Sequence, residues 1–138
     1  MRILIVTDWP SQRAGTERYI RDLRGGLTDD GQEVRLMTSS IGSAADGSAD
    51  YVARATDRRR AQAFLQVANP SALATLRRAL HEFEPDVVHL VMFLPYLSPA
   101  VMAPLRGRPA TLAVSDLKSI CPNAVSYTHL TLPTTPYV

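Results

Sequence analysis

Short apolar runs alternate with amphipathic stretches along most of this chain. The first run, Ile3 to Val6, is continuous and rich in branched side chains, which is typical of a strand buried on both faces of a parallel sheet. Similar runs predict strands at 34–38, 87–91 and 111–114, and a short edge strand at 51–55.

Helical spacing fills the intervals between these runs. Thr16 fits the N-cap of a first helix that Asp29-Asp30-Gly31 ends, and further helices are predicted at 59–67, from Pro70 up to Pro85, and at 98–105. The first and third helices carry apolar stripes, made by Tyr19, Ile20, Leu23 and Leu27 and by Leu73, Leu76, Leu80 and Phe83.

The alternation of strands and helices predicts an α/β fold, a Rossmann-like parallel sheet flanked by helices. In such a sheet ligands bind beyond the carboxyl ends of the strands. We therefore expect the site where those ends emerge, at 7–16, 38–43, 90–94 and 115–123.

The segment 125–138 differs from everything before it. It holds no Lys, Arg, Asp or Glu, whereas all 15 Lys and Arg and all 13 Asp and Glu lie upstream. The string resembles a translated sequencing-library adapter; the alternative is a natural Thr/Pro-rich tail. We predict that 1–124 is an incomplete domain and 125–138 a non-native tail.

Composition sets only broad limits on function. With 46% hydrophobic and 20% charged residues and a net charge of +2, the chain is an ordinary globular protein that need not bind nucleic acid. The single cysteine, Cys121, excludes an internal disulfide and fits a reducing compartment, so a cytoplasmic location is expected. Nothing around Cys121 points to a catalytic thiol.

The turn after the first strand lacks the glycine signatures of nucleotide-binding enzymes. Neither Gly-x-Gly-x-x-Gly nor the Gly-x-x-x-x-Gly-Lys loop is present, which disfavours a nicotinamide oxidoreductase and a P-loop kinase. Gly15 still opens a helix, where free amides can hold a phosphate or carboxylate. The alternative is a turn glycine that only starts the helix.

Several short motifs together resemble the amino-terminal domain of family 4 glycosyltransferases. Their joint order and spacing carry the resemblance. The motifs are Met1 to Val6, Ala-Gly-Thr-Glu at 14–17, Gly-Gln-Glu-Val at 31–34, Pro-Asp-Val-Val-His at 85–89, Leu-Ser-Pro at 97–99, and Asp-Leu-Lys-Ser-Ile-Cys-Pro-Asn at 116–123.

The resemblance implies a GT-B architecture, in which two Rossmann-like domains face each other across a cleft. It implies transfer of a sugar from a nucleotide-sugar to a sugar or lipid-linked acceptor, with retention of configuration and no bound metal or other cofactor. This chain would be the acceptor-side domain, without the carboxyl-terminal domain that binds the donor. It further implies a role in cell envelope polysaccharide synthesis.

Some relatives work on lipid-linked acceptors, so a peripheral contact with the inner face of the membrane is a second implication. The basic runs Arg58-Arg59-Arg60 and Arg77-Arg78 are candidates for that contact. The alternative reading is that both runs lie on solvated helix faces.

The resemblance also assigns candidate substrate-binding residues. Ala14, Gly15 and Thr16 match the glycine-rich turn of the family, with Ala14 in place of its first glycine, and His89 matches the histidine of the Pro-Asp-Val-Val-His motif. Ser115 and Asp116 match a His-Asp pair.

The chain departs from the family pattern at functional positions. Many relatives carry histidine and asparagine where this sequence has Val91 and Met92, and Ser115 cannot act as a base at neutral pH as histidine can. Asp116 remains a weak catalytic candidate and otherwise a turn or cap residue, and no other catalytic residue is assignable. These departures keep open a stand-alone, non-catalytic Rossmann-like binding module.

Overall fold

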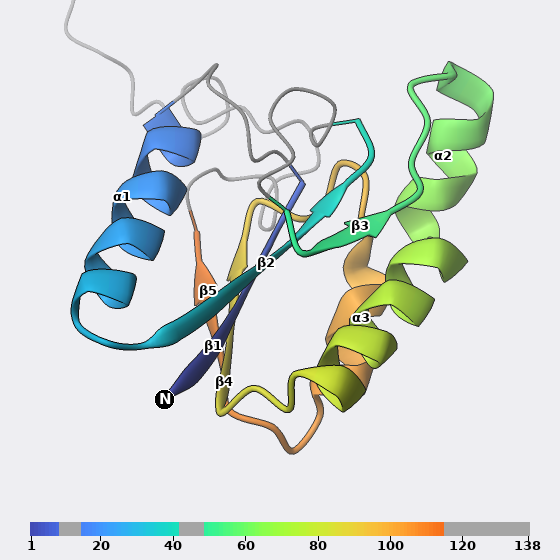
Figure 1. Cartoon of the computed structure of the whole chain (residues 1–138). Coiled ribbons are helices and arrows are strands. Elements are labelled where there is room, and N and C mark those ends of the chain that lie inside the picture. Colours follow the sequence, from blue (N-terminus) through green and yellow to red (C-terminus); the bar gives the residue numbers. More distant parts are fainter. Residues whose placement is uncertain (9–14, 42–48, 115–138) are drawn as a thin grey trace, which may run out of the picture.

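A single parallel sheet forms the centre of the structure (Figure 1). The computed structural model describes residues 1–8, 15–41 and 49–114. The five strands lie in the order β3-β2-β1-β4-β5. Their bounds are β1 (Arg2–Thr7), β2 (Glu33–Ser39), β3 (Tyr51–Ala53), β4 (Val87–Val91) and β5 (Ala110–Ala113).

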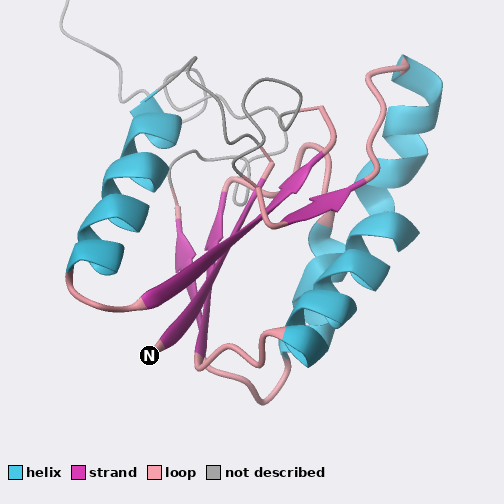
Figure 2. Ribbon diagram, viewed as in Figure 1, coloured by secondary structure: helices cyan, strands magenta, loops and turns pink. Residues whose placement is uncertain are grey.

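Helices cover both faces of this sheet and give three layers (Figure 2). Helix α1 (Gly15–Asp29) packs on one face, and α3 (Pro70–Glu82) with the 3-10 helix η2 (Pro99–Leu105) packs on the other, with α2 (Arg59–Val67) beside η2. Crossovers between parallel strands are right-handed. The β1-to-β2 connection and the β3-to-β4 connection run in opposite directions across the sheet, so their helices lie on opposite faces.

The alternating side chains of β1 divide the core in two. Ile3 and Ile5 pack towards α1, whereas Leu4 and Val6 pack towards α3 and η2, and all four are buried. Burying each such side chain contributes about 1.5–3 kcal/mol. The continuous apolar run therefore reflects a central strand that is covered on both faces, as predicted.

The predicted elements are confirmed, with differences at their ends. Helix α1 begins at Gly15, so Thr16 lies in its first turn and is not its N-cap. Strand β3 ends at Ala53 because the next two amides, of Arg54 and Ala55, donate to the hydroxyls of Ser71 (2.9 Å) and Ser40 (2.9 Å) and not to the neighbouring strand.

Two further details differ from the sequence prediction. The helix expected at 98–105 is a 3-10 helix with Pro104 inside it, and a proline has no amide hydrogen to donate to an α-helical ladder. Tyr19, assigned to the apolar stripe of α1, remains 44% exposed, while Ile20 of the same stripe is buried.

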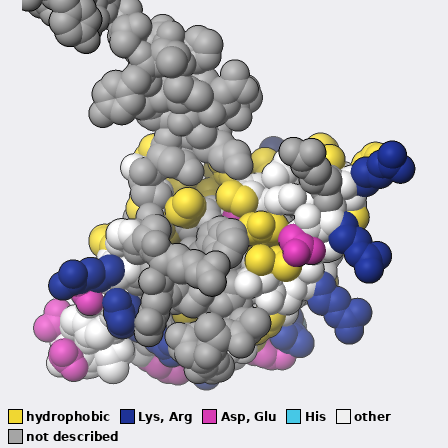
Figure 3. Space-filling model, turned by 90° about the horizontal axis from the view of Figure 1, so that it is seen from above, with side chains coloured by type: hydrophobic (Ala, Val, Ile, Leu, Met, Phe, Trp, Pro, Cys, Tyr) yellow, Lys and Arg dark blue, Asp and Glu magenta, His cyan; other side chains and the backbone are white. Residues whose placement is uncertain are grey.

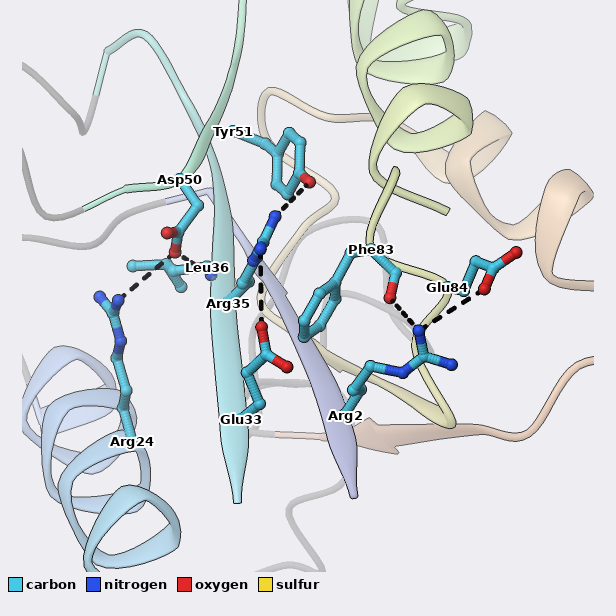
Figure 4. A network of polar contacts seen from close by, with 9 residues as sticks. All are labelled: Arg2, Arg24, Glu33, Arg35, Leu36, Asp50, Tyr51, Phe83 and Glu84. Carbon is cyan, nitrogen blue, oxygen red and sulfur yellow. Dashed lines mark hydrogen bonds and ion pairs between the residues drawn. The ribbon is translucent and has the colours of Figure 1, made fainter. Parts of the chain in front are cut away.

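An ordered polar network ties β2 to its neighbours on both faces (Figure 4). The Asp50 carboxylate accepts from the Leu36 amide (2.8 Å) and pairs with Arg24 of α1 (3.4 Å). On the other face Arg35 donates to the Tyr51 hydroxyl (3.1 Å) and lies over the Phe83 ring. This hydrogen bond to the Tyr51 hydroxyl stabilises the charged guanidinium and raises the pKa of Arg35.

Candidate functional site at the carboxyl edge of the sheet

At the carboxyl edge of the sheet, the connections that follow β1 and β4 lead in opposite directions. The connection after β1 leads to β2 on one side, and the connection after β4 leads to β5 on the other, which is the arrangement beside which doubly wound sheets usually bind ligands. The structure describes parts of the predicted segments, namely 7–8, 15–16, 38–41 and 90–94. Residues 15–16 open α1, and the other ranges lie at the ends of β1, β2 and β4 or directly follow them. These segments therefore meet at one edge of the sheet, and ligand binding at that edge stays a prediction.

Asp8 holds this edge together, a role that the sequence analysis did not assign. Its buried carboxylate accepts hydrogen bonds from the amides of Tyr96 (2.9 Å) and Leu97 (2.8 Å), and its own amide donates to the Met92 carbonyl (3.1 Å). Its carbonyl accepts from the Ser39 hydroxyl (2.8 Å). One residue thus joins the ends of β1, β2 and β4, and its carboxylate is engaged with the chain.

A second buried residue, Asn69, continues the network to the start of α3. Its side-chain oxygen accepts from the Ala72 amide (3.1 Å), which caps α3, and its amide group donates to the carbonyls of Arg54 (3.0 Å) and Tyr96 (2.9 Å). The turn after β4 is therefore fixed from two sides, by Asp8 and by Asn69.

His89 lies in the middle of β4, on the face covered by α1. Its Nδ1 lies 2.7 Å from the Thr111 hydroxyl and its Nε2 lies 3.2 Å from the Tyr19 hydroxyl. Burial lowers the pKa of His89, so the neutral ring is favoured. These contacts are those of a histidine packed within the fold, and a ligand role for His89 stays a prediction.

The positions at which the chain departs from the family pattern have distinct environments. Val91 is fully buried in the α1-side core, a place where the histidine of relatives would need polar partners. Met92 has a positive φ of 46°, a conformation that asparagine adopts more readily than methionine. The backbone at 92 therefore suits the asparagine of relatives better than the methionine found here.

Gly15 is the described part of the candidate glycine turn. It is exposed, and a Cβ atom built on it would meet nothing within 4 Å. Packing among the described residues therefore does not require a glycine at this position. Ala14, Ser115, Asp116 and Cys121, and the side chain of Thr16, lie outside the described part of the chain, so their predicted roles stay predictions.

The fold defines a Rossmann-like α/β domain, a parallel sheet flanked by helices. The glycosyl transferase 4-like domain, a protein family, matches residues 14–131 of the chain. The chain belongs to that family. No curated protein matches the sequence.

The matched range runs past residue 124, so it does not mark the boundary predicted between 124 and 125. The origin of 125–138 stays a prediction. In the described residues, no helix is long and apolar enough to cross a membrane.

Proposed function

We propose that this chain is the acceptor-side domain of a retaining glycosyltransferase that uses a nucleotide-sugar donor and no bound metal or other cofactor. The family match over 14–131 is the observation that carries the proposal, and it does not favour the stand-alone binding module. The chemistry needs an acceptor hydroxyl held in line with the sugar and a partner for the departing diphosphate. A second domain, encoded downstream, would supply the diphosphate contacts.

The described residues support the acceptor-side part of this proposal. Asp8 and Asn69 rigidify the strand ends and the turn 93–98, and a rigid edge can hold an acceptor without paying an ordering cost on binding. Gly15 opens a 15-residue helix at the same edge. The backbone amides of the first turn of that helix would face an anionic group in the cleft.

Enzyme assays on two proteins test the proposal. The 138-residue chain is expected to show no release of nucleoside diphosphate from any of a panel of nucleotide-sugars, whereas the product of the longer coding sequence is expected to turn one over. Nuclear magnetic resonance of the glycosylated acceptor would show that the anomeric configuration of the donor sugar is retained. Turnover by the 138-residue chain, or a natural stop codon just after Asn123, would contradict the proposal.

Substitution of Gly15 tests the cleft assignment in the longer protein. Because a Cβ meets nothing there, Gly15→Ala is expected to leave the melting temperature within about 2 °C of wild type and to lower kcat/KM at least about fivefold. Gly25→Ala, in the same helix and equally open, is the matched control and should leave kcat/KM unchanged. Equal kcat/KM in both variants would remove Gly15 from the site.

Peripheral contact with anionic membranes forms a second part of the proposal. Helix α2 exposes two large apolar side chains, Phe64 (81% exposed) and Val67 (76%), beside the exposed Arg58 and Arg60. Figure 3, seen from above the carboxyl edge, shows basic side chains projecting on the side of α2 and α3. Apolar side chains flanked by cations are typical of helices that bind the membrane interface.

Vesicle co-sedimentation tests this contact. Binding to phosphatidylglycerol vesicles, but not to phosphatidylcholine vesicles, is expected, and Phe64→Ser/Val67→Ser should weaken it by at least about tenfold. Met102→Ser removes an exposed apolar side chain from η2 and serves as the control. Unaltered vesicle binding by the α2 variant would exclude α2 as the contact.

A further inference from the structure

An open cavity of about 620 Å³ lies between the end of α3 and the turn that follows η2. Leu80, Pro85 and Pro104 line it with apolar surface. Its volume falls within the range of about 300–1,000 Å³ that is usual for small-molecule sites.

The cavity is at the opposite edge of the sheet from the candidate site. Pro85 precedes β4, and the turn after η2 leads into β5, where the Pro109 carbonyl accepts from the Val88 amide (3.1 Å). These are the amino ends of the parallel strands, whereas the candidate site lies at their carboxyl ends. A ligand here would not touch the sugar-transfer site.

Two arginine side chains and one histidine side chain surround the apolar lining. Arg77 and His81 are one helical turn apart on α3, and Arg108 follows η2. Gly107, with a φ of 75°, makes the turn that carries Arg108, whose amide donates to the Leu105 carbonyl (3.0 Å). Within 1–8, 15–41 and 49–114, neither Arg77 nor Arg108 forms an ion pair.

Among the described residues, one carboxylate, that of Glu84, lines the cavity, and it is already paired. Glu84 pairs with Arg2 at 3.5 Å, and the same guanidinium donates to the Phe83 carbonyl (3.0 Å), as Figure 4 shows. The end of α3 adds a partial negative charge of about half an elementary charge, which is smaller than the two unpaired guanidinium charges. The cavity therefore has an excess of positive charge.

We propose that this cavity binds a phosphate-bearing small molecule at a site separate from the sugar-transfer crevice. Guanidinium groups bind phosphate through paired, charge-assisted hydrogen bonds, so Arg77 and Arg108 hold the phosphate from two sides. The His81 ring supplies one more polar contact. Leu80, Pro85 and Pro104 receive the uncharged body of the ligand.

Calorimetric titration of the 138-residue chain with inorganic pyrophosphate tests the proposal. Saturable binding is expected, and Arg77→Gln/Arg108→Gln should weaken it by at least about tenfold because two charge-assisted contacts are lost. Arg60→Gln/Arg106→Gln removes the same charge from exposed positions that do not line the cavity, and should change the affinity less than about twofold. All three proteins should melt within about 2 °C of one another.

Two results would overturn the proposal: no saturable binding by the wild-type chain, or an equal loss of affinity in both double variants. The second result would mean that net charge alone attracts the anion. Neither result bears on sugar transfer, which is measured separately in the longer protein.

The phosphate has two sources, a soluble metabolite or a lipid headgroup, and vesicles distinguish them. If Arg77→Gln/Arg108→Gln lowers binding to phosphatidylglycerol vesicles and pyrophosphate competes with the vesicles, the occupant is a headgroup. If vesicle binding is unchanged while pyrophosphate binding is lost, the occupant is a soluble phosphate.

Discussion

At the scale of single residues, the most informative side chain is a carboxylate that serves structure. Asp8 directly follows a buried strand, where a functional acid is also commonly found, yet its two oxygens accept from successive amides in the turn after β4. Buried amides left without acceptors destabilise a protein by about 1–3 kcal/mol each. The carboxylate therefore stabilises the candidate site without being available as its base.

Removing this carboxylate should destabilise the fold. Asp8→Ala is expected to lower the free energy of unfolding in urea by about 2–4 kcal/mol, and Asp8→Asn by less because one oxygen remains. Asp22→Ala, which removes an exposed carboxylate paired with Arg18 at 3.7 Å, should stay within about 0.5 kcal/mol of wild type. Equal losses for Asp8→Ala and Asp22→Ala would contradict this role.

His89 should make stability depend on pH. Burial lowers its pKa in the folded state, so below the unfolded value of about 6.5 the unfolded chain binds more protons and stability falls as the pH falls. Above that value the contribution is constant. We expect the urea midpoint to drop between about pH 7.5 and about pH 5.5, and to drop less in His89→Gln. The same drop in both proteins would assign the effect to other groups.

At the scale of elements, the ends of helices and strands depend on partners that lie elsewhere in the chain. Helix α3 starts at Pro70 as predicted, but Asn69 fixes the start because its side chain caps the helix and also holds the turn after β4. Helix α2 begins after Arg58, whose side chain makes no cap hydrogen bond. Two adjacent helices therefore begin with very different local stabilisation.

The two helix starts provide a matched pair of substitutions. Asn69→Ala should lower the free energy of unfolding by about 2–3 kcal/mol, since it removes the cap and two buried donors. Arg58→Ala, at the equivalent position of α2, should change it by less than about 0.5 kcal/mol. Comparable losses from both substitutions would show that the buried contacts of Asn69 contribute little.

At the scale of the whole molecule, one sheet carries two separate surfaces. The carboxyl edge bears the candidate site, and the amino edge holds the cavity lined by Arg77, His81 and Arg108. Parallel strands make this separation possible, because all their carboxyl ends meet at one edge and all their amino ends at the other.

Deleting 125–138 tests whether that segment belongs to this molecule's fold. No helical or alternating apolar pattern there suits the core, so a chain ending at Ala124 should melt within about 2 °C of the full chain. The alternative is that the segment belongs to the domain, because the family match reaches residue 131. A fall in melting temperature of more than about 5 °C would show that the segment stabilises the domain.

The sequence by itself determined the elements and the sheet class, and it predicted the edge at which the candidate site lies. Apolar spacing reports burial directly, so it located α2 and β4 at their observed bounds and predicted the two-sided burial of β1. Only the tertiary structure decided the strand order, the bracing role of Asp8, the mid-strand position of His89 between Tyr19 and Thr111, and the cavity at the amino edge. Each depends on contacts between distant parts of the chain, as when Asp8 meets Leu97, and local spacing does not encode such partners.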